Sequence, residues 1–175
     1  MGLTVLVGGA RSGKSALAVR MARGWDGPVA VVATAEARDP EMAARIARHR
    51  RERPAHWETL EEPRDLVGAL RKIPVGTCLI IDCLTLWVSN LLEAEAPEDR
   101  VLAQAEEAAR LAAHRGAPGF VVSNEVGSGI VPANALARSF RDLLGRVNAL
   151  WVQSAHEAFL VVAGRLVRLE QPHVP

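Results

Sequence analysis

Lysine is scarce in this chain of 175 residues: only Lys14 and Lys72 stand among its 21 basic side chains, and the others are arginines. A general preference for arginine over lysine explains this at least as well as a thermal adaptation does. A lysine that remains in such a chain therefore marks a position to examine for a task that arginine cannot perform.

Net charge is also small, +1 at neutral pH, and aromatic side chains are few, with three Phe, four Trp and no Tyr. A near-neutral chain has no overall field to hold a polyanion, and scarce aromatics offer few surfaces on which bases could stack. These absences argue against a protein that binds nucleic acid. Any basic patch must then be local and suited to a small anion.

Apolar runs of membrane-spanning length and an N-terminal signal segment are absent, so we expect a cytoplasmic protein with no integral membrane segment. The two cysteines, Cys78 and Cys83, flank an apolar run without a second pair of ligands nearby. We expect them to pack in the core and not to bind zinc. The 49% hydrophobic and 23% charged residues are typical of one globular domain over residues 1–175.

Short apolar runs alternate with helical patterns along the chain. The predicted strands lie at 3–7, 28–34, 77–82 and 119–125, with two more at the end, joined through Gly164 and Arg165. The predicted helices lie at 14–25, 39–51, 63–72, 98–114 and 133–153. Residues 84–92 fit either type, and we favour helix. Strands separated by helices indicate a mostly parallel α/β sheet with helices on both faces.

The segment GGARSGKS fits the phosphate-binding pattern G-x-x-x-x-G-K-[ST] and lies between an apolar strand and an amphipathic helix. Its glycines let backbone N–H groups wrap a phosphate chain, Lys14 would reach the β and γ phosphates, and the Ser15 hydroxyl would bind Mg²⁺. The residues of this cradle are Gly8, Gly9, Ala10, Arg11, Ser12, Gly13, Lys14 and Ser15. The pattern predicts nucleotide binding.

Two further segments follow predicted strands. Asp82 ends the strand LIID, where a carboxylate can hold Mg²⁺, recognise a base or simply cap the next helix. The glycines of NEVGSGIVP, residues 124–132, indicate a close approach to a ligand, a hinge or a plain loop.

Residues 45–53, RIARHRRER, hold five arginines and His49. On a helix Arg45 and His49 share one face. Each arginine alone could be a solvated surface residue, and a lone histidine is most often structural. As a group the cations repel one another unless an anion neutralises them, and a triphosphate is the available anion. Neighbouring cations also favour the neutral imidazole, which can attack phosphorus.

Five segments in chain order resemble the bifunctional adenosylcobinamide kinase/adenosylcobinamide-phosphate guanylyltransferase family. They are GGARSGKS, EMAARIARHRRERPAHWET, DCLTLWVSNLL, NEVGSGIVP and RSFRDLLGRVN, and the resemblance runs from Gly8 to about Gly164. The cradle is common to P-loop proteins, whereas the histidine segment and NEVGSGIVP are more diagnostic. The resemblance implies a homotrimer and a P-loop NTPase fold with a RecA-like sheet, to which the last two predicted strands add a C-terminal hairpin.

The resemblance also implies two reactions. ATP or GTP first phosphorylates the aminopropanol hydroxyl of adenosylcobinamide. A histidine then attacks the α phosphate of GTP and passes the bound GMP to adenosylcobinamide phosphate, which gives adenosylcobinamide-GDP. That histidine maps onto His49, since Arg48 stands where some members have a second histidine. His56 and Trp57 would pack and position the loop that follows.

The site residues implied by the resemblance are His49 and Lys14 for catalysis, and Ser15 and Asp82 for Mg²⁺. The implied nucleotide contacts beyond the cradle are Ala33, Thr34, Ala35, Arg50, Arg51, Glu52, Arg53, Asp82, and Glu61 with Glu62 as its alternative. The arginines would neutralise the triphosphate while His49 attacks.

Two other hypotheses compete with this one. A simple P-loop small-molecule kinase would use only the γ phosphate, and His49 would take no part. A nucleotide-switched module or nucleic-acid motor would use residues 45–53 as an arm for a polyanion, which the small net charge and scarce aromatics disfavour.

Overall fold

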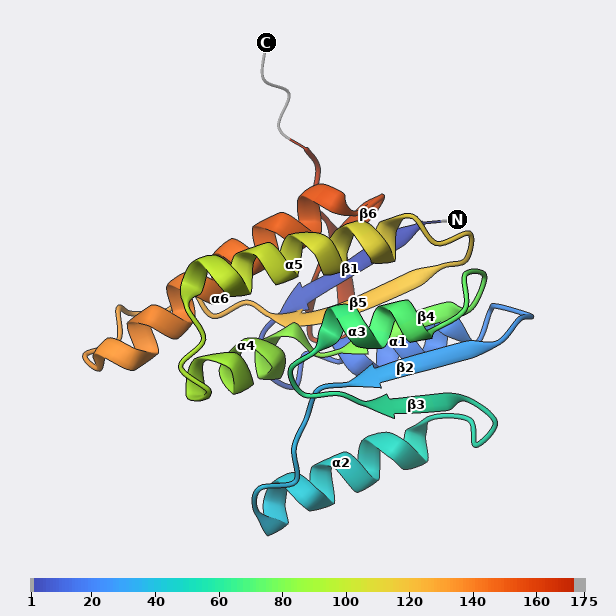
Figure 1. Cartoon of the computed structure of the whole chain (residues 1–175), viewed down its shortest axis with the longest axis horizontal. Coiled ribbons are helices and arrows are strands. Elements are labelled where there is room, and N and C mark those ends of the chain that lie inside the picture. Colours follow the sequence, from blue (N-terminus) through green and yellow to red (C-terminus); the bar gives the residue numbers. More distant parts are fainter. Residues whose placement is uncertain (1, 172–175) are drawn as a thin grey trace.

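A single seven-stranded sheet forms the centre of the molecule, in a computed structural model that describes residues 2–171. The strands are β1 (Leu3–Gly8), β2 (Val29–Ala33), β3 (Glu58–Glu61), β4 (Cys78–Asp82), β5 (Gly119–Asn124), β6 (Glu157–Val162) and β7 (Arg165–Arg168). Their order across the sheet is β3-β2-β4-β5-β1-β6-β7. All neighbouring pairs are parallel except β6 and β7, which form an antiparallel hairpin (Figure 1).

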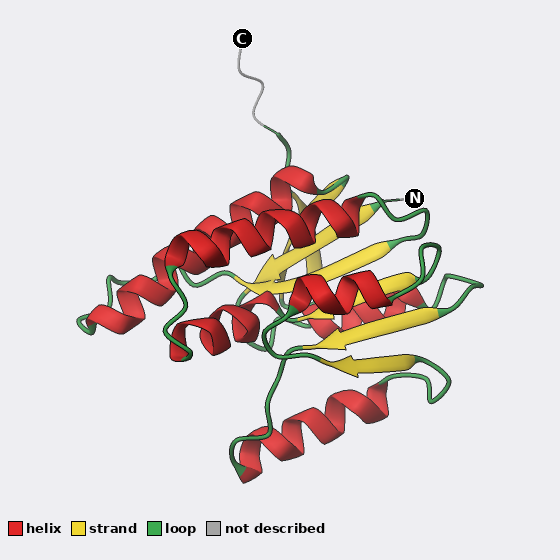
Figure 2. Cartoon of the chain, viewed as in Figure 1, coloured by secondary structure: helices red, strands yellow, loops and turns green. Residues whose placement is uncertain are grey.

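Helices cover both faces of the sheet (Figure 2). They are α1 (Lys14–Ala22), α2 (Pro40–Glu52), α3 (Leu66–Lys72), α4 (Leu84–Glu93), α5 (Glu98–Ala113) and α6 (Ala135–Ser154). The helix α1 packs on one face, and α3 to α6 supply the larger core on the other. Along the β3 edge lies α2, apart from the other helices.

The strands explain this division, because successive side chains of a strand point to opposite faces. In β1, Val5 and Val7 belong to the core under α3 to α6, whereas Leu6 packs with α1. In β4, Ile81 belongs to the core under α3 to α6, whereas Ile80 packs with α1. Continuous apolar runs are therefore the pattern of strands that are buried on both sides.

The predicted fold class is confirmed: a mostly parallel α/β sheet with helices on both faces and a C-terminal hairpin. The helix preferred for residues 84–92 is also correct. The hairpin turns at Ala163 and Gly164, one residue earlier than predicted, and both have positive φ angles of 49° and 76°.

The strand β3 was missed by the sequence analysis. It has four residues, ETLE, and three of them are exposed, so no apolar periodicity marks it. Its register with β2 pairs Ala33 with Glu61, which places these two residues side by side at the carboxyl edge of the sheet.

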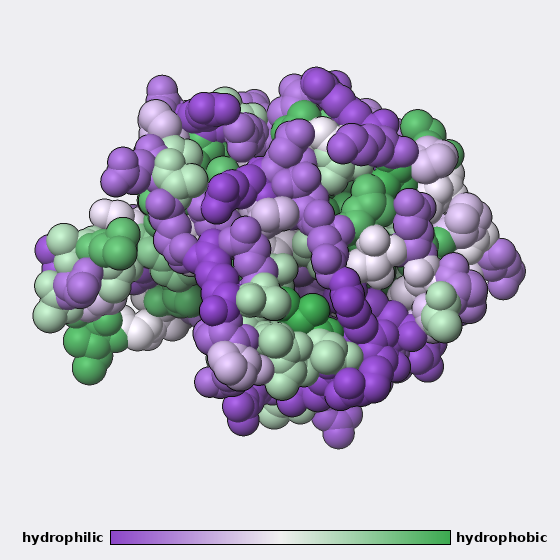
Figure 3. Space-filling model, turned by 60° about the horizontal axis from the view of Figure 1, so that its bottom comes forward, coloured by the Kyte–Doolittle hydropathy of each residue, from purple (hydrophilic) through white to green (hydrophobic). Residues whose placement is uncertain are grey.

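The surface is hydrophilic over most of the face in Figure 3, but green hydrophobic residues gather on the projection at its left. The segment between β5 and α6 carries the exposed side chains of Ile130, with 97% exposure, and Val131, and Leu136 is exposed in the first turn of α6. Among the described residues no helix is long and apolar enough to cross a membrane.

Candidate active site

The connection from the end of β1 into α1 requires glycine at two positions. Gly13, the residue before α1, has φ +98°, a backbone conformation that L side chains rarely adopt. At Gly8 a Cβ atom would lie 2.3 Å from the carbonyl oxygen of Val161 on β6. The loop can therefore lie close against the neighbouring strand and turn sharply into the helix.

Lys14 is folded back into this loop. Its Nζ donates to the carbonyl oxygens of Gly8 at 2.9 Å and Gly9 at 2.7 Å, and lies 3.3 Å from Ser12 Oγ. The side chain is only 6% exposed, and burial lowers its pKa. The ammonium group thus lies among the oxygen acceptors of the loop, where a phosphate chain would offer it further ones.

Asp82, at the carboxyl end of β4, connects the cradle to α2. Its Oδ1 accepts a hydrogen bond from Ser15 Oγ at 2.9 Å, while Oδ2 lies 3.3 Å from His49 Nδ1 and 3.1 Å from an Arg53 nitrogen. Burial opposes ionisation of this carboxyl group, but the hydrogen bond and charge of His49, with Arg53 and Ser15, lower its pKa. The group is therefore an anion in the folded protein.

The helix α2 begins at an N-cap, because Asp39 Oδ1 accepts from the backbone N–H of Met42 at 2.7 Å and Pro40 occupies the first turn. One stripe of the helix faces a pocket. The residues that line this pocket are Ala33, Ala35, Met42, Arg45, Ile46, His49, Arg50, Arg53, Glu61, Asp82, Cys83 and Leu86. The pocket is thus walled by α2 and by the carboxyl ends of β2, β3 and β4.

Several of the residues implied by the resemblance meet at this pocket: Ala33, Ala35, His49, Arg50, Arg53, Glu61 and Asp82. Arg50 forms an ion pair with Glu61. Glu62, the alternative to Glu61, instead accepts from the backbone N–H groups of Arg64 and Asp65.

Three other residues lie off the pocket. Thr34 is fully buried, and its hydroxyl bonds to both the carbonyl oxygen and the N–H of Cys83. Arg51 and Glu52 are exposed on other sides of α2, where the Glu52 carbonyl accepts from Arg23. The positions of Arg51 and Glu52 follow from helical spacing, since residues 49, 50 and 53 share a face of α2 that residues 51 and 52 do not.

Sequence reasoning left five pocket residues off its list of contacts, Cys83 among them. Met42, Arg45 and Ile46 precede His49 by seven, four and three positions, so the helical repeat could have found them. Leu86 of α4 had no such signal, because its approach to α2 depends on the order of the strands.

The packing expected for four residues has mixed outcomes. Cys78 lies in the core as expected, but Cys83 is half-buried and lines the pocket. Burial and then the charge of Asp82 raise the pKa of the Cys83 thiol to about 11. Trp57 packs in the core on the α1 face, whereas His56 is exposed, so the packing role expected for His56 is wrong.

Fold and cradle together define a P-loop nucleotide-binding protein of the RecA-like α/β type. Solved structures with this fold include the RadB recombinase, with a TM-score of 0.53 and 18% identity over 91% of this chain and 73% of that one. The Pyrococcus horikoshii OT3 protein PH0250 has a TM-score of 0.56 at 7% identity, covering 95% of this chain and 85% of that one. These likenesses concern the fold alone.

Sequence comparison is more specific. The family model for cobinamide kinase / cobinamide phosphate guanyltransferase matches residues 4–169, and the chain belongs to this family. It is therefore an enzyme with kinase and guanylyltransferase activities in cobalamin biosynthesis.

Three relatives match this chain over nearly their full length. The bifunctional adenosylcobalamin biosynthesis protein CobP of Pseudomonas aeruginosa is 44% identical, with 91% of this chain and 92% of the relative covered. The CobU proteins of Salmonella typhimurium and Escherichia coli are 41% and 36% identical, and each comparison covers 96% of this chain and 99% of the relative.

Proposed function

We propose that the enzyme transfers GMP through a covalent guanylyl-histidine on His49, after it has phosphorylated the aminopropanol hydroxyl of adenosylcobinamide with ATP or GTP. One observation carries this proposal: His49 Nδ1 lies 3.3 Å from the same Asp82 carboxylate that accepts from Ser15 at 2.9 Å. The histidine of α2 thus lies next to a carboxylate that also contacts the phosphate cradle.

The contact with Asp82 assigns a role to each ring nitrogen. A carboxylate beside Nδ1 favours the tautomer with its proton on Nδ1, which leaves a lone pair on Nε2. Nε2 attacks the α phosphorus of GTP, an N–P bond forms, and the bond to the β phosphate oxygen breaks to release pyrophosphate. A phosphate oxygen of adenosylcobinamide phosphate then attacks the same phosphorus and frees His49.

The cationic side chains around the pocket can stabilise the negative charge that develops in this reaction. Arg45, Arg50 and Arg53 line the pocket with His49, and Lys14 lies in the cradle. Guanidinium groups bind phosphate oxygens in two-point contacts and stabilise the charge that moves onto pyrophosphate as it leaves. The ion pair with Glu61 holds Arg50 at the pocket before a nucleotide binds.

Ser15 and Asp82 fit a Mg²⁺ site. Hydroxyl and carboxylate oxygens are ligands that Mg²⁺ prefers, and Ser15 Oγ lies 2.9 Å from Asp82 Oδ1. The lowered pKa of Asp82 keeps the carboxylate ionised. When bound, Mg²⁺ would supply charge neutralisation to the phosphates, and phosphate oxygens with water would complete its ligands.

We also propose a homotrimer, which the family resemblance implies. The exposed side chains of Ile130, Val131 and Leu136 support an assembly, because subunit contact would remove this apolar surface from water.

The test uses GTP labelled at either the α or the γ phosphate, with Mg²⁺, and detects label on the denatured chain. We expect an acid-labile, alkali-stable adduct from the α label only, mapping to His49. In His49→Ala, adduct and adenosylcobinamide-GDP formation should fall by about a thousandfold or more, while most of the kinase activity remains.

His56→Ala is the matched control, because His56 is exposed and lies outside the residues that line the pocket. It should form the adduct at the wild-type rate. Label from the γ phosphate, or an adduct that persists in His49→Ala, would refute the role of His49.

A further inference from the structure

Asn90 is a buried amide in an otherwise largely apolar helix. It lies on α4 and is 4% exposed. Its Nδ2 donates to the carbonyl oxygens of Thr34 at 2.8 Å and Pro63 at 3.0 Å, and its Oδ1 accepts from Arg38 at 3.0 Å. Both donors of the amide and its oxygen are therefore satisfied, as a buried polar group requires.

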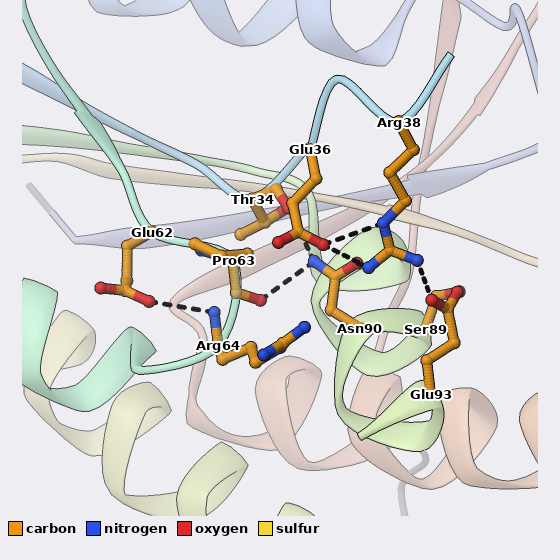
Figure 4. Close-up of polar contacts among 9 residues, drawn as sticks. All are labelled: Thr34, Glu36, Arg38, Glu62, Pro63, Arg64, Ser89, Asn90 and Glu93. Atoms are coloured by element: carbon orange, nitrogen blue, oxygen red, sulfur yellow. Dashed lines mark hydrogen bonds and ion pairs between the residues drawn. The ribbon is translucent and has the colours of Figure 1, made fainter. Parts of the chain in front are cut away.

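The three partners of Asn90 belong to two loops beside the pocket (Figure 4). Thr34 lies between Ala33 and Ala35, which line the pocket after β2. Pro63 follows β3 two residues after Glu61, which also lines the pocket. One side chain on α4 thus joins the loop after β2 to the loop after β3.

Arg38 extends this connection to the helix that carries His49. It precedes Asp39, the N-cap of α2, and besides Asn90 it forms ion pairs with Glu36 and Glu93. Figure 4 shows the guanidinium group of Arg38 between the Glu36 carboxylate and α4. The start of α2 is therefore attached to α4 by polar contacts.

Polar attachment matters here because α2 has no buried residue. A helix that buries an apolar face is positioned by packing, but this helix lacks that constraint. Its position depends on the loop at its start and on the contacts of His49, Arg50 and Arg53 near its end.

We propose that Asn90 is a positioning residue for guanylyl transfer. It fixes the loops after β2 and β3 and, through Arg38, the start of α2, and so sets where His49 and Glu61 lie around the nucleotide. Asn90 acts through these segments and does not contact the reacting atoms. The inference rests on the proposed role of His49.

The test compares two rates in Asn90→Ala: adduct formation from α-labelled GTP, and γ-phosphoryl transfer to adenosylcobinamide. Adduct formation should fall about 10- to 100-fold, because small misplacements of a nucleophile cost that much, while γ transfer changes less than about threefold. The cradle lies on the loop between β1 and α1, which Asn90 does not contact. Loss of folded protein alone would lower both rates equally.

Arg115→Ala is the matched control for lost stability. Arg115 is 7% exposed and donates to the carbonyl oxygens of Leu70, Ile73 and Pro74, away from the pocket. Removing it also leaves buried carbonyl groups without their donors. The melting temperature should fall, but the ratio of the two rates should stay at the wild-type value.

Arg38→Ala tests the same attachment without a buried vacancy, since the Arg38 side chain is 40% exposed. Arg38→Ala should lower the ratio of adduct formation to γ transfer, as Asn90→Ala does. It serves as the test if Asn90→Ala does not fold. An unchanged ratio of adduct formation to γ transfer in Asn90→Ala would overturn the inference. If Asn90→Ala does not fold, an unchanged ratio in Arg38→Ala would overturn it. A wild-type enzyme that forms no adduct would instead refute the role of His49, and this inference with it.

Discussion

Lys14 and Lys72 are the two lysines of the chain, and their surroundings differ completely. Lys14 is buried and donates to the carbonyl oxygens of Gly8 and Gly9, whereas Lys72 is exposed at the end of α3. An ammonium group is compact and can enter a tight loop of carbonyl groups, but a planar guanidinium group of larger size cannot do so without displacing the backbone.

Lys14→Met and Lys14→Arg should therefore both lower the kinase and guanylyltransferase activities, by roughly a hundredfold or more, since each reaction needs the triphosphate in the cradle. Lys72→Met removes the same charge from an exposed site and should leave both activities intact. Steady-state rates of the two reactions check this. Wild-type rates in Lys14→Arg would show that the site accepts either cation.

At the scale of elements, α2 and α6 differ in what stabilises them. Both begin with a side-chain cap, Asp39 in α2 and Asn134 in α6. The helix α6 also buries Leu143, Leu144, Val147 and Trp151, whereas α2 buries none of its residues. Short helices without packing are marginal in water, so α2 should depend more strongly on its cap.

Asp39→Ala should cost about 1 kcal/mol of local helix stability. Hydrogen exchange of the first turns of α2 should accelerate, while the midpoint of global unfolding changes little. In Asn134→Ala the loss should instead appear in global unfolding, because α6 is part of the core. Equal exchange rates in wild type and Asp39→Ala would contradict this account.

For the whole molecule, buried thiols link stability to pH. Cys78 is fully buried between strands and α1, and this burial raises its pKa from 9.0 to about 11, against the smaller opposing effect of the Arg115 charge. Because of this raised pKa, the folded protein keeps the Cys78 thiol proton at pH values between 9 and 11, where the unfolded chain loses it. This contribution to stability is present below pH 9 and is lost as the pH rises towards 11.

Cys78→Ala should therefore have a less steep alkaline loss of stability than the wild type. The expected difference in slope is about 1.4 kcal/mol per pH unit for one thiol. Urea unfolding at several pH values between 9 and 11 measures it, and the comparison cancels the contributions of Cys83 and Lys14, which titrate in both proteins. Parallel curves for the two proteins would contradict the prediction.

The sequence by itself determined the features that depend on neighbours along the chain. The cradle uses eight consecutive residues, the start of α2 uses Asp39 and Pro40, and buried strands appear as continuous apolar runs. The strand β3 gave no such signal, because it is a short edge strand with exposed side chains.

Only the tertiary structure decided which of these features meet. Asp82 joins Ser15, His49 and Arg53, which lie 67, 33 and 29 positions away, and Asn90 joins Thr34 to Pro63. These contacts depend on the order β3-β2-β4 and on the register that brings the ends of three parallel strands to one edge. Local propensity and periodicity do not specify strand order, since long-range pairing is set by the packing of the whole sheet.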